Sequence, residues 1–198
     1  MDYPTNVDGR QTLTGYQVRV NSSGNIVADP HTGILYVTFS DNRDGTHDSA
    51  TPVTNTDVFV VSSTDGGATW SAPVAVDSSS TDQWFPWADV SPVDGTLGVA
   101  FNDRSLGDPS LYDATLAEST GGGFGLTTVS TASSHPTDSL FFQAGVTGCE
   151  TYATFHGDYI GLAFGSDGVA NVAWTDMRDQ DPALGAGYQQ FVYVARVP

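Results

Sequence analysis

The sequence predicts an all-β protein made of β-propeller blades, with three four-stranded antiparallel sheets in succession. Short apolar runs alternate with turns rich in glycine, proline and aspartate along the 198 residues. No long segment has apolar side chains at helical spacing, which argues against helices. One strand pattern also recurs three times, and successive units of four short strands are typical of propeller blades.

The recurring strand is rich in small and β-branched residues and ends in an aromatic residue, one further residue and an aspartate, with an arginine one or two positions later. It covers 34–43, 96–104 and 170–178. Its aspartates and arginines are Asp41, Asp103, Asp176, Arg43, Arg104 and Arg178. Each copy lies between a preceding and a following apolar run, so we expect it to be the second strand of a blade.

We expect one domain with blades at about 21–80, 84–133 and 155–198. The third unit ends after its third strand, and the strand-like segment 12–20 is expected to complete it, because closing strands protect the edges of propellers. Propellers usually close with about 4 to 8 blades. Two alternatives remain: a half-propeller within a longer protein, or a strand-swapped homodimer that forms a six-bladed ring.

The charge of the chain limits its partners. The formal net charge is −17, with 23 acidic residues against 6 basic ones. Such a surface repels nucleic acid and anionic membranes, and it suits a secreted or extracellular setting. No run is long and apolar enough to span a membrane, and no N-terminal signal peptide is recognisable. The single cysteine, Cys149, excludes a disulfide within the chain.

A turn between two strand-like runs, 57–62 and 71–76, carries the most specific motif. Its Asp-Gly-Gly sequence favours a hairpin, because glycine tolerates positive φ. The pattern S-x-D-x-G-x-x-W is formed by Ser63, Asp65, Gly67 and Trp70. We expect the carboxylate to accept backbone hydrogen bonds in the turn and the indole to be buried between layers. The motif resembles the Asp box of the sialidase-like, BNR-repeat β-propellers, where it is a folding device.

In such a propeller, the loops after the repeated aspartates share one face with the loops that cross between blades, opposite the Asp box. We expect the three Asp–Arg pairs to gather there around the central opening. The crossing loops would add Trp84 and Trp87 from one segment, and His156, Asp158 and Tyr159 from another. Arginine binds carboxylates in bidentate fashion, so this face is a candidate carbohydrate site.

The resemblance to bacterial sialidases implies hydrolysis of terminal glycosidic bonds, with three arginines on the substrate carboxylate, a tyrosine–glutamate nucleophile pair and an aspartic acid. On that basis the candidate catalytic residues are His156, Asp158 and Tyr159. The sequence departs from the family in lacking its Arg-Ile-Pro motif. Its arginines also recur at equivalent positions, which favours internal braces. The alternative is therefore a non-catalytic propeller that binds glycans or proteins.

The sequence assigns no metal ligands, and the expected hydrolysis requires no cofactor. The residues Ser40, Asn42, Asp44 and Gly45 are similar to the start of a calcium loop. The acid expected later in such a loop is replaced by Thr51. A structural calcium ion held by aspartate-rich loops stays open.

Overall fold

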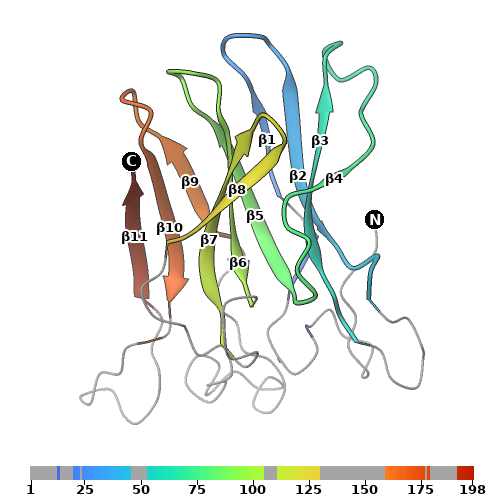
Figure 1. Ribbon diagram of the computed structural model, residues 1–198, viewed down its shortest axis with the longest axis vertical. Helices are drawn as coiled ribbons and strands as arrows, with labels where there is room; N and C mark the ends of the chain where they lie inside the picture. Colours follow the sequence, from blue (N-terminus) through green and yellow to red (C-terminus); the bar gives the residue numbers. More distant parts are fainter. Residues whose placement is uncertain are drawn as a thin grey trace, which may run out of the picture.

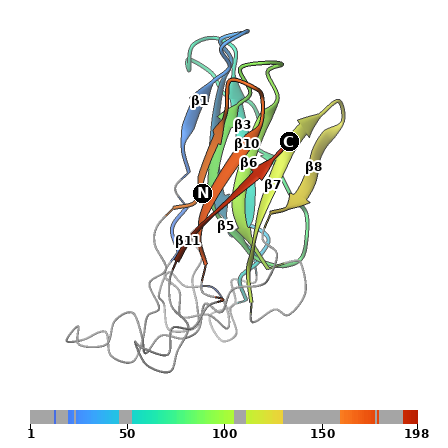
Figure 2. The same ribbon diagram turned by 90° about the vertical axis from the view of Figure 1, so that its left-hand side faces the viewer.

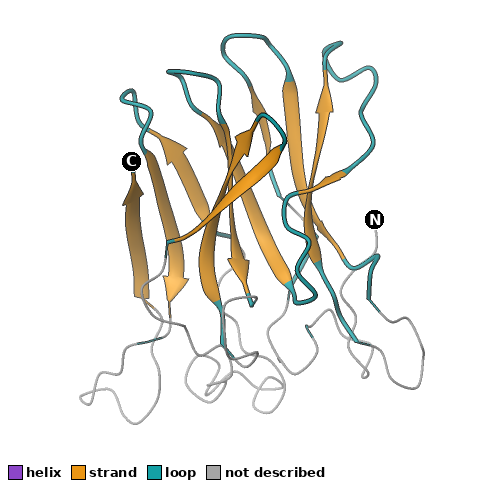
Figure 3. Ribbon diagram, viewed as in Figure 1, coloured by secondary structure: helices purple, strands orange, loops and turns teal. Residues whose placement is uncertain are grey.

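The computed structural model describes residues 13, 20–22, 24–45, 53–104, 111–129, 159–176, 178 and 191–198. All the regular elements in these residues are strands (Figure 3). They form three antiparallel sheets that lie side by side (Figure 1). The prediction of an all-β protein with propeller-like blades is confirmed.

The sheets follow one another along the chain. Blade 1 has the order β1 (Ile26–Ala28), β2 (Leu35–Asp41), β3 (Asp57–Ser63) and β4 (Val74–Ala75). Blade 2 has the order β5 (Gln83–Val90), β6 (Leu97–Asp103), β7 (Asp113–Thr120) and β8 (Gly123–Thr128). Blade 3 has β9 (Gly161–Phe164), β10 (Ala170–Asp176) and β11 (Phe191–Val197). In Figure 2, β1 and β8 lie on opposite sides of the molecule, as first and fourth strands of neighbouring blades should.

The turn between the first two strands of each blade has the same backbone conformation. Gly33, Gly95 and Gly168 have φ values of 75°, 78° and 78°. The N–H of each glycine donates to a carbonyl three or four residues earlier. This left-handed conformation favours glycine, so the repeat seen in the sequence is also a repeat of backbone geometry.

Both faces of blade 2 are buried, because blade 1 packs on one and blade 3 on the other. Side chains alternate between the two faces of a strand. Val99 and Phe101 of β6 pack with Val58 and Val60 of blade 1. The layer toward blade 3 is formed by Ala100, Ala114, Leu116, Ile160, Leu162, Val172 and Trp174. Consequently every residue of β6 is buried.

Close approach at Gly98 lets blades 2 and 3 pack tightly. A Cβ atom at this position would lie 2.8 Å from the Phe164 ring. Hydrogen bonds also link the first strands of successive blades. The Asn25 side chain exchanges two bonds with the backbone of Ala88, of 2.7 and 2.8 Å, and the Phe164 N–H donates to Asp89 Oδ2 at 2.7 Å.

The outward faces of blades 1 and 3 carry exposed apolar side chains. Ile26 of blade 1 is 58% exposed, and Val192 and Val194 of blade 3 are 76% and 66% exposed. The segment 12–20, expected to complete blade 3, lies outside the described residues except for Leu13 and Val20. These two are buried in a cluster with Trp84, Phe85 and Tyr112 of blade 2.

The Asp box turn is held by hydrogen bonds to Ser63 and Asp65. The Ser63 hydroxyl donates to Asp65 Oδ1 at 2.8 Å and accepts from the Gly67 N–H at 2.9 Å. Asp65 accepts from the Thr69 N–H at 2.9 Å and from its hydroxyl at 2.6 Å. The expected burial of Trp70 is wrong: its side chain is 41% exposed, because the ring stays at the rim of blade 1, beside Gly67.

Replacing Asp65 with alanine should lower the melting temperature near pH 7 and have less effect in acid. Hydrogen bonds from the Thr69 side chain and N–H, and from Ser63, lower the pKa of Asp65 to about 2 from 3.8. A lowered folded-state pKa gives stability that is present above pH 4 and lost as the pH falls toward 2. Melting curves of both proteins at pH 7, 4 and 2.5 measure this. A difference in melting temperature that is independent of pH would contradict it.

Candidate functional site

The repeated aspartates end β2, β6 and β10, at the end of the sheets opposite the Asp box. Asp41 lies across from Asp57, whereas Leu35, at the other end of β2, lies across from Ser63. The Asp box turn therefore follows β3 at the upper end in Figure 1, and the repeated aspartates lie at the lower end. This is the arrangement expected from the sequence.

In blades 1 and 3, the arginine bridges its own aspartate to an aromatic ring on the third strand. Arg43 Nη2 lies 2.6 Å from Asp41 Oδ2, and its guanidinium lies 4.0 Å from the centre of the Phe59 ring. Arg178 forms the same ion pair with Asp176 and lies 4.6 Å from the centre of the Tyr193 ring. Both aspartates are buried. These contacts match internal braces, and binding of a substrate by these arginines stays a prediction.

In blade 2 the arginine binds an acid outside the repeated strand. Arg104 Nη1 lies 2.8 Å from Asp82 Oδ2, in the segment that leads into β5. Asp82 also accepts from the Thr54 hydroxyl at 3.0 Å and the Thr56 N–H at 2.9 Å, so it ties blade 1 to blade 2. Burial raises the pKa of Asp82, while the bonds from Thr56, Arg104 and Thr54 oppose the rise. Asp103 accepts from the Thr115 hydroxyl at 3.0 Å. The role of Asp82 was not anticipated, since its partners are distant in the sequence.

The two tryptophans of β5 lie in different surroundings. Trp84 is completely buried and its ring meets Tyr112 edge-on, with centres 5.5 Å apart. Trp87 is only partly buried and meets Tyr159 edge-on, with centres 6.4 Å apart. A bulge inserts one extra residue between the tryptophans, and Phe85 there has a φ of 53°. The bulge keeps Trp84 and Trp87 on the same face of the sheet.

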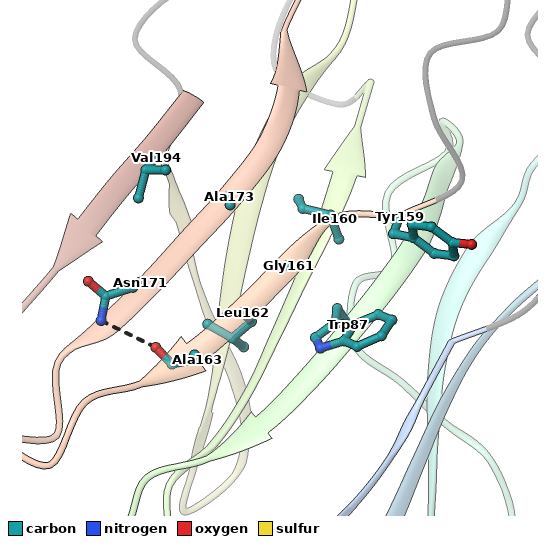
Figure 4. A pocket seen from close by; sticks show the side chains of 9 residues that line it. All are labelled: Trp87, Tyr159, Ile160, Gly161, Leu162, Ala163, Asn171, Ala173 and Val194. Carbon is teal, nitrogen blue, oxygen red and sulfur yellow. Dashed lines mark hydrogen bonds between the residues drawn. The ribbon is translucent and has the colours of Figure 1, made fainter. Parts of the chain in front are cut away.

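Trp87 and Tyr159 form one wall of an apolar cleft of about 540 Å³ along the first strand of blade 3 (Figure 4). The Tyr159 side chain is 70% exposed. Gly161, Ala163, Ala173 and Val194 line the rest of the cleft together with Ile160, Leu162 and Asn171. The Asn171 amide is oriented by hydrogen bonds from its Nδ2 to the carbonyls of Ala163 and Val169, of 3.3 and 3.1 Å. His156 and Asp158 lie outside the described residues.

A second, smaller hollow is acidic. It has a volume of about 190 Å³ and is lined by Asp44, Asn55, Asp57, Ala75, Asp77 and Ser78–Ser80. Asp57 is only 4% exposed. Burial, then repulsion from Asp44 and a hydrogen bond with it, then repulsion from Asp77 and Asp82, raise the pKa of Asp57 to about 7. Asp57 was not predicted as a site residue, although an aspartate that opens the apolar run 57–62 was a usable signal in the sequence.

Two features are absent from the described part of the chain. Its residues include no three His, Cys, Asp or Glu side chains already grouped as metal ligands. They also form no helix with the length and apolar character needed to cross a bilayer.

Comparison with known proteins shows likeness to solved structures alone. No family model and no curated protein matches the chain. A protein of unknown function from Dyadobacter fermentans aligns with 87% of this chain and 37% of its own, at 18% identity and a TM-score of 0.48. An N-acetylgalactosamine deacetylase from F. plautii, solved with blood group B trisaccharide, aligns with 90% of this chain and 50% of its own, at 14% identity and a TM-score of 0.45.

A third structure, the intramolecular trans-sialidase from Ruminococcus gnavus with oseltamivir carboxylate, aligns with 87% of this chain and 32% of its own. The identity is 16% and the TM-score 0.36. The chain thus spans half or less of the length of each of these three structures.

Replacing Arg104 with methionine should destabilise the protein by about 3 kcal/mol, because it leaves the buried Asp82 without its guanidinium partner. The matched control is Arg196→Met. Arg196 pairs with Asp167 at 2.7 Å, but both side chains are more than half exposed, so the loss should stay within about 0.5 kcal/mol. Urea unfolding of the two variants measures the difference. Equal losses would contradict the role assigned to Asp82.

Proposed function

We propose that this chain is a carbohydrate-binding unit of a sialidase-like propeller, and that the cleft between Trp87 and Tyr159 is its sugar site. The observation that carries the proposal is an exposed tyrosine beside a partly buried tryptophan, above a largely apolar floor. Aromatic rings present an apolar body for packing and a polar tip for hydrogen bonding. The C–H face of a sugar ring would pack on the wall, and its hydroxyls would meet the Asn171 amide and the Tyr159 hydroxyl.

The size and charge of the cleft favour a neutral sugar. Its volume of about 540 Å³ falls within the range of about 300 to 1,000 Å³ of small-molecule sites. None of the described residues that line it is charged. The net charge of −17 would oppose the approach of an anionic ligand. A neutral mono- or disaccharide therefore fits better than a sialoside.

Glycoside hydrolysis is the second candidate, and the exposure of Tyr159 at this cleft favours it. In this mechanism the Tyr159 oxygen would attack the anomeric carbon as a carboxylate, for which the sequence offers Glu150, takes its proton, and Asp158 would protonate the leaving oxygen. Water, deprotonated by Asp158, would then displace Tyr159 from the sugar, and the proton held by Glu150 would return to the tyrosine oxygen. The arginines of the Asp–Arg pairs would then contact a substrate carboxylate. In the described contacts these arginines bind the protein's own acids, which places binding ahead of hydrolysis.

Tyr159→Ala should weaken binding of the preferred sugar at least fivefold, equivalent to about 1 kcal/mol for a lost ring contact. Phe191→Ala is the control, since Phe191 is 41% exposed and does not line the cleft. A glycan array identifies the sugar, and calorimetry measures the affinities. Equal affinity of Tyr159→Ala and wild type would rule out the cleft as the site.

The same variants, with Tyr159→Phe added, separate the two candidates. On fluorogenic glycosides, including sialosides, a binding unit releases no fluorophore, and Tyr159→Phe keeps most of the affinity. Turnover that Tyr159→Phe abolishes would establish hydrolysis instead.

Assembly into a six-bladed ring of two copies is an alternative to the sugar site, because Val194 of the cleft lies on the outward face of blade 3 that such a ring would cover. The repeat makes Val194 of blade 3 equivalent to Leu116, which faces the next blade, and Ile26 of blade 1 equivalent to Ala88, which faces the preceding blade. The open face of blade 3 therefore has the character of the face that packs on a following blade. Blade 1 of a second copy offers the matching face, and the contact repeats to close a ring.

Such a ring should have twice the mass of the chain, 20.8 kDa, in light scattering. Val192→Asp places a charge on the open face of blade 3 and should yield monomers. Leu126→Asp, on the outermost strand of blade 2 and 48% exposed, should leave the dimer intact. A wild-type chain that is monomeric at micromolar concentration would overturn the paired ring, whereas a dimer that Val192→Asp dissociates would argue against the sugar site.

A further inference from the structure

We propose that the hollow between Asp57 and Asp77 of blade 1 binds one calcium ion. The ligands would be the carboxylates of Asp44, Asp57 and Asp77 and the amide oxygen of Asn55, completed by serine hydroxyls and water. The proposal is independent of the sugar site.

Two strands and one loop bring these oxygens together. Asp57 begins β3, and Asp77 follows β4, which runs alongside β3. The bond from the Val76 N–H to the Val58 carbonyl, of 2.8 Å, continues the pairing of Ala75 with Phe59. Asp57 and Asp77 therefore lie next to each other on the outward face of blade 1. Asp44 comes from the loop after β2.

Hydrogen bonds from neighbouring groups orient the proposed ligands and leave other oxygen atoms of the same side chains available to the ion. The Ser78 and Ser79 N–H groups donate to Asp77 Oδ1 at 2.6 and 3.2 Å. The Asn55 N–H donates to Asn42 Oδ1 at 2.8 Å, which holds Asn55 against the loop that carries Asp44.

Three oxygens of this hollow are buried acceptors without a hydrogen-bond donor. They are Oδ1 of Asp57, Oδ2 of Asp77 and Oδ1 of Asn55. Leaving a buried polar atom unpaired costs about 1 to 3 kcal/mol, and more for a charged one. A proton on Asp57 would satisfy a single oxygen of this group and would leave the others unpaired. One cation can contact all three.

The donor chemistry selects the kind of ion. The described lining offers carboxylate, amide and hydroxyl oxygens and neither histidine nor cysteine, which disfavours zinc. Calcium accepts six to eight oxygen ligands, including amide oxygens and water, in flexible geometry. Magnesium requires a near-ideal octahedron and keeps several waters. The mixed carboxylate, amide and hydroxyl oxygens of the lining therefore fit calcium better than magnesium.

The site differs from the calcium loop that the sequence suggests. Of that loop it uses only Asp44, and the other ligands come from the beginning of β3 and the end of β4. A bound ion would therefore fasten the loop after β2 to the outer strands of blade 1. It would also replace the mutual repulsion of three neighbouring carboxylates by attraction.

Calorimetry and thermal melting of the full chain test the proposal. After treatment with EDTA and buffer exchange, the wild-type chain should bind one Ca²⁺ and melt at a higher temperature in 1 mM CaCl₂ than in EDTA. Mg²⁺ at the same concentration should give a smaller increase. Asp57→Asn and Asp77→Asn should each raise the Kd for Ca²⁺ at least tenfold. Asp167→Asn, an exposed aspartate outside the hollow, should leave it unchanged.

A second readout separates loss of the site from loss of the fold. In EDTA, Asp57→Asn should melt no lower than wild type, because the substitution removes a buried charge that is repelled by its neighbours. No binding of Ca²⁺ by the wild-type chain at millimolar concentration would overturn the proposal. Undiminished binding by both variants, or an equal response to Mg²⁺, would also overturn it.

Discussion

The packing of one sheet face against the next is the constraint on which this structure depends. Blade 2 lies between two neighbours, so β6 must be apolar or small at nearly every position, and Gly98 admits the Phe164 ring where a Cβ would clash. Because both faces of this antiparallel strand are buried, the sequence of β6 does not alternate between polar and apolar residues. Blades 1 and 3 have one such face each. On their other faces no further blade packs among the described residues, so the valines and the isoleucine there are exposed.

The ion pairs at the lower end of the blades follow from this packing. A strand that ends between two layers carries its last polar group into a buried place, where a carboxylate needs a partner. Arg43 and Arg178 reach back over an aromatic ring to the aspartate of the same blade, whereas Arg104 reaches Asp82, which also joins blade 1 through Thr54 and Thr56. The described arginines at this end therefore bind acids of the protein itself, whereas the cleft beside Tyr159 carries the exposed aromatic ring on which the proposed sugar site depends.

Sequence reasoning predicted the features that depend on local spacing. The three repeats and the end of the sheets that carries the aspartates follow from periodicity and strand alternation. The features it missed depend on contacts between distant segments. Asp82 meets Arg104 across 22 residues, and the hollow at Asp57 joins Asp44 to Asp77. The exposure of Trp70 was missed for a related reason, because the indole could be placed only once the neighbouring layer was known. For His156 and Asp158 the sequence hypothesis stays untested, since they lie outside the described residues.

The bulge in β5 has a consequence for how this strand tolerates changes in length. By adding one residue between Trp84 and Trp87, it sets which side chains beyond it point toward blade 1 and which toward blade 3. Deletion of a single residue there would exchange the two faces of the strand beyond it. The Asp89 carboxylate would then enter the apolar core now filled by Ala88 and Val90. This chain should therefore tolerate insertions and deletions in its connecting loops far better than in the stretch from Trp84 to Trp87.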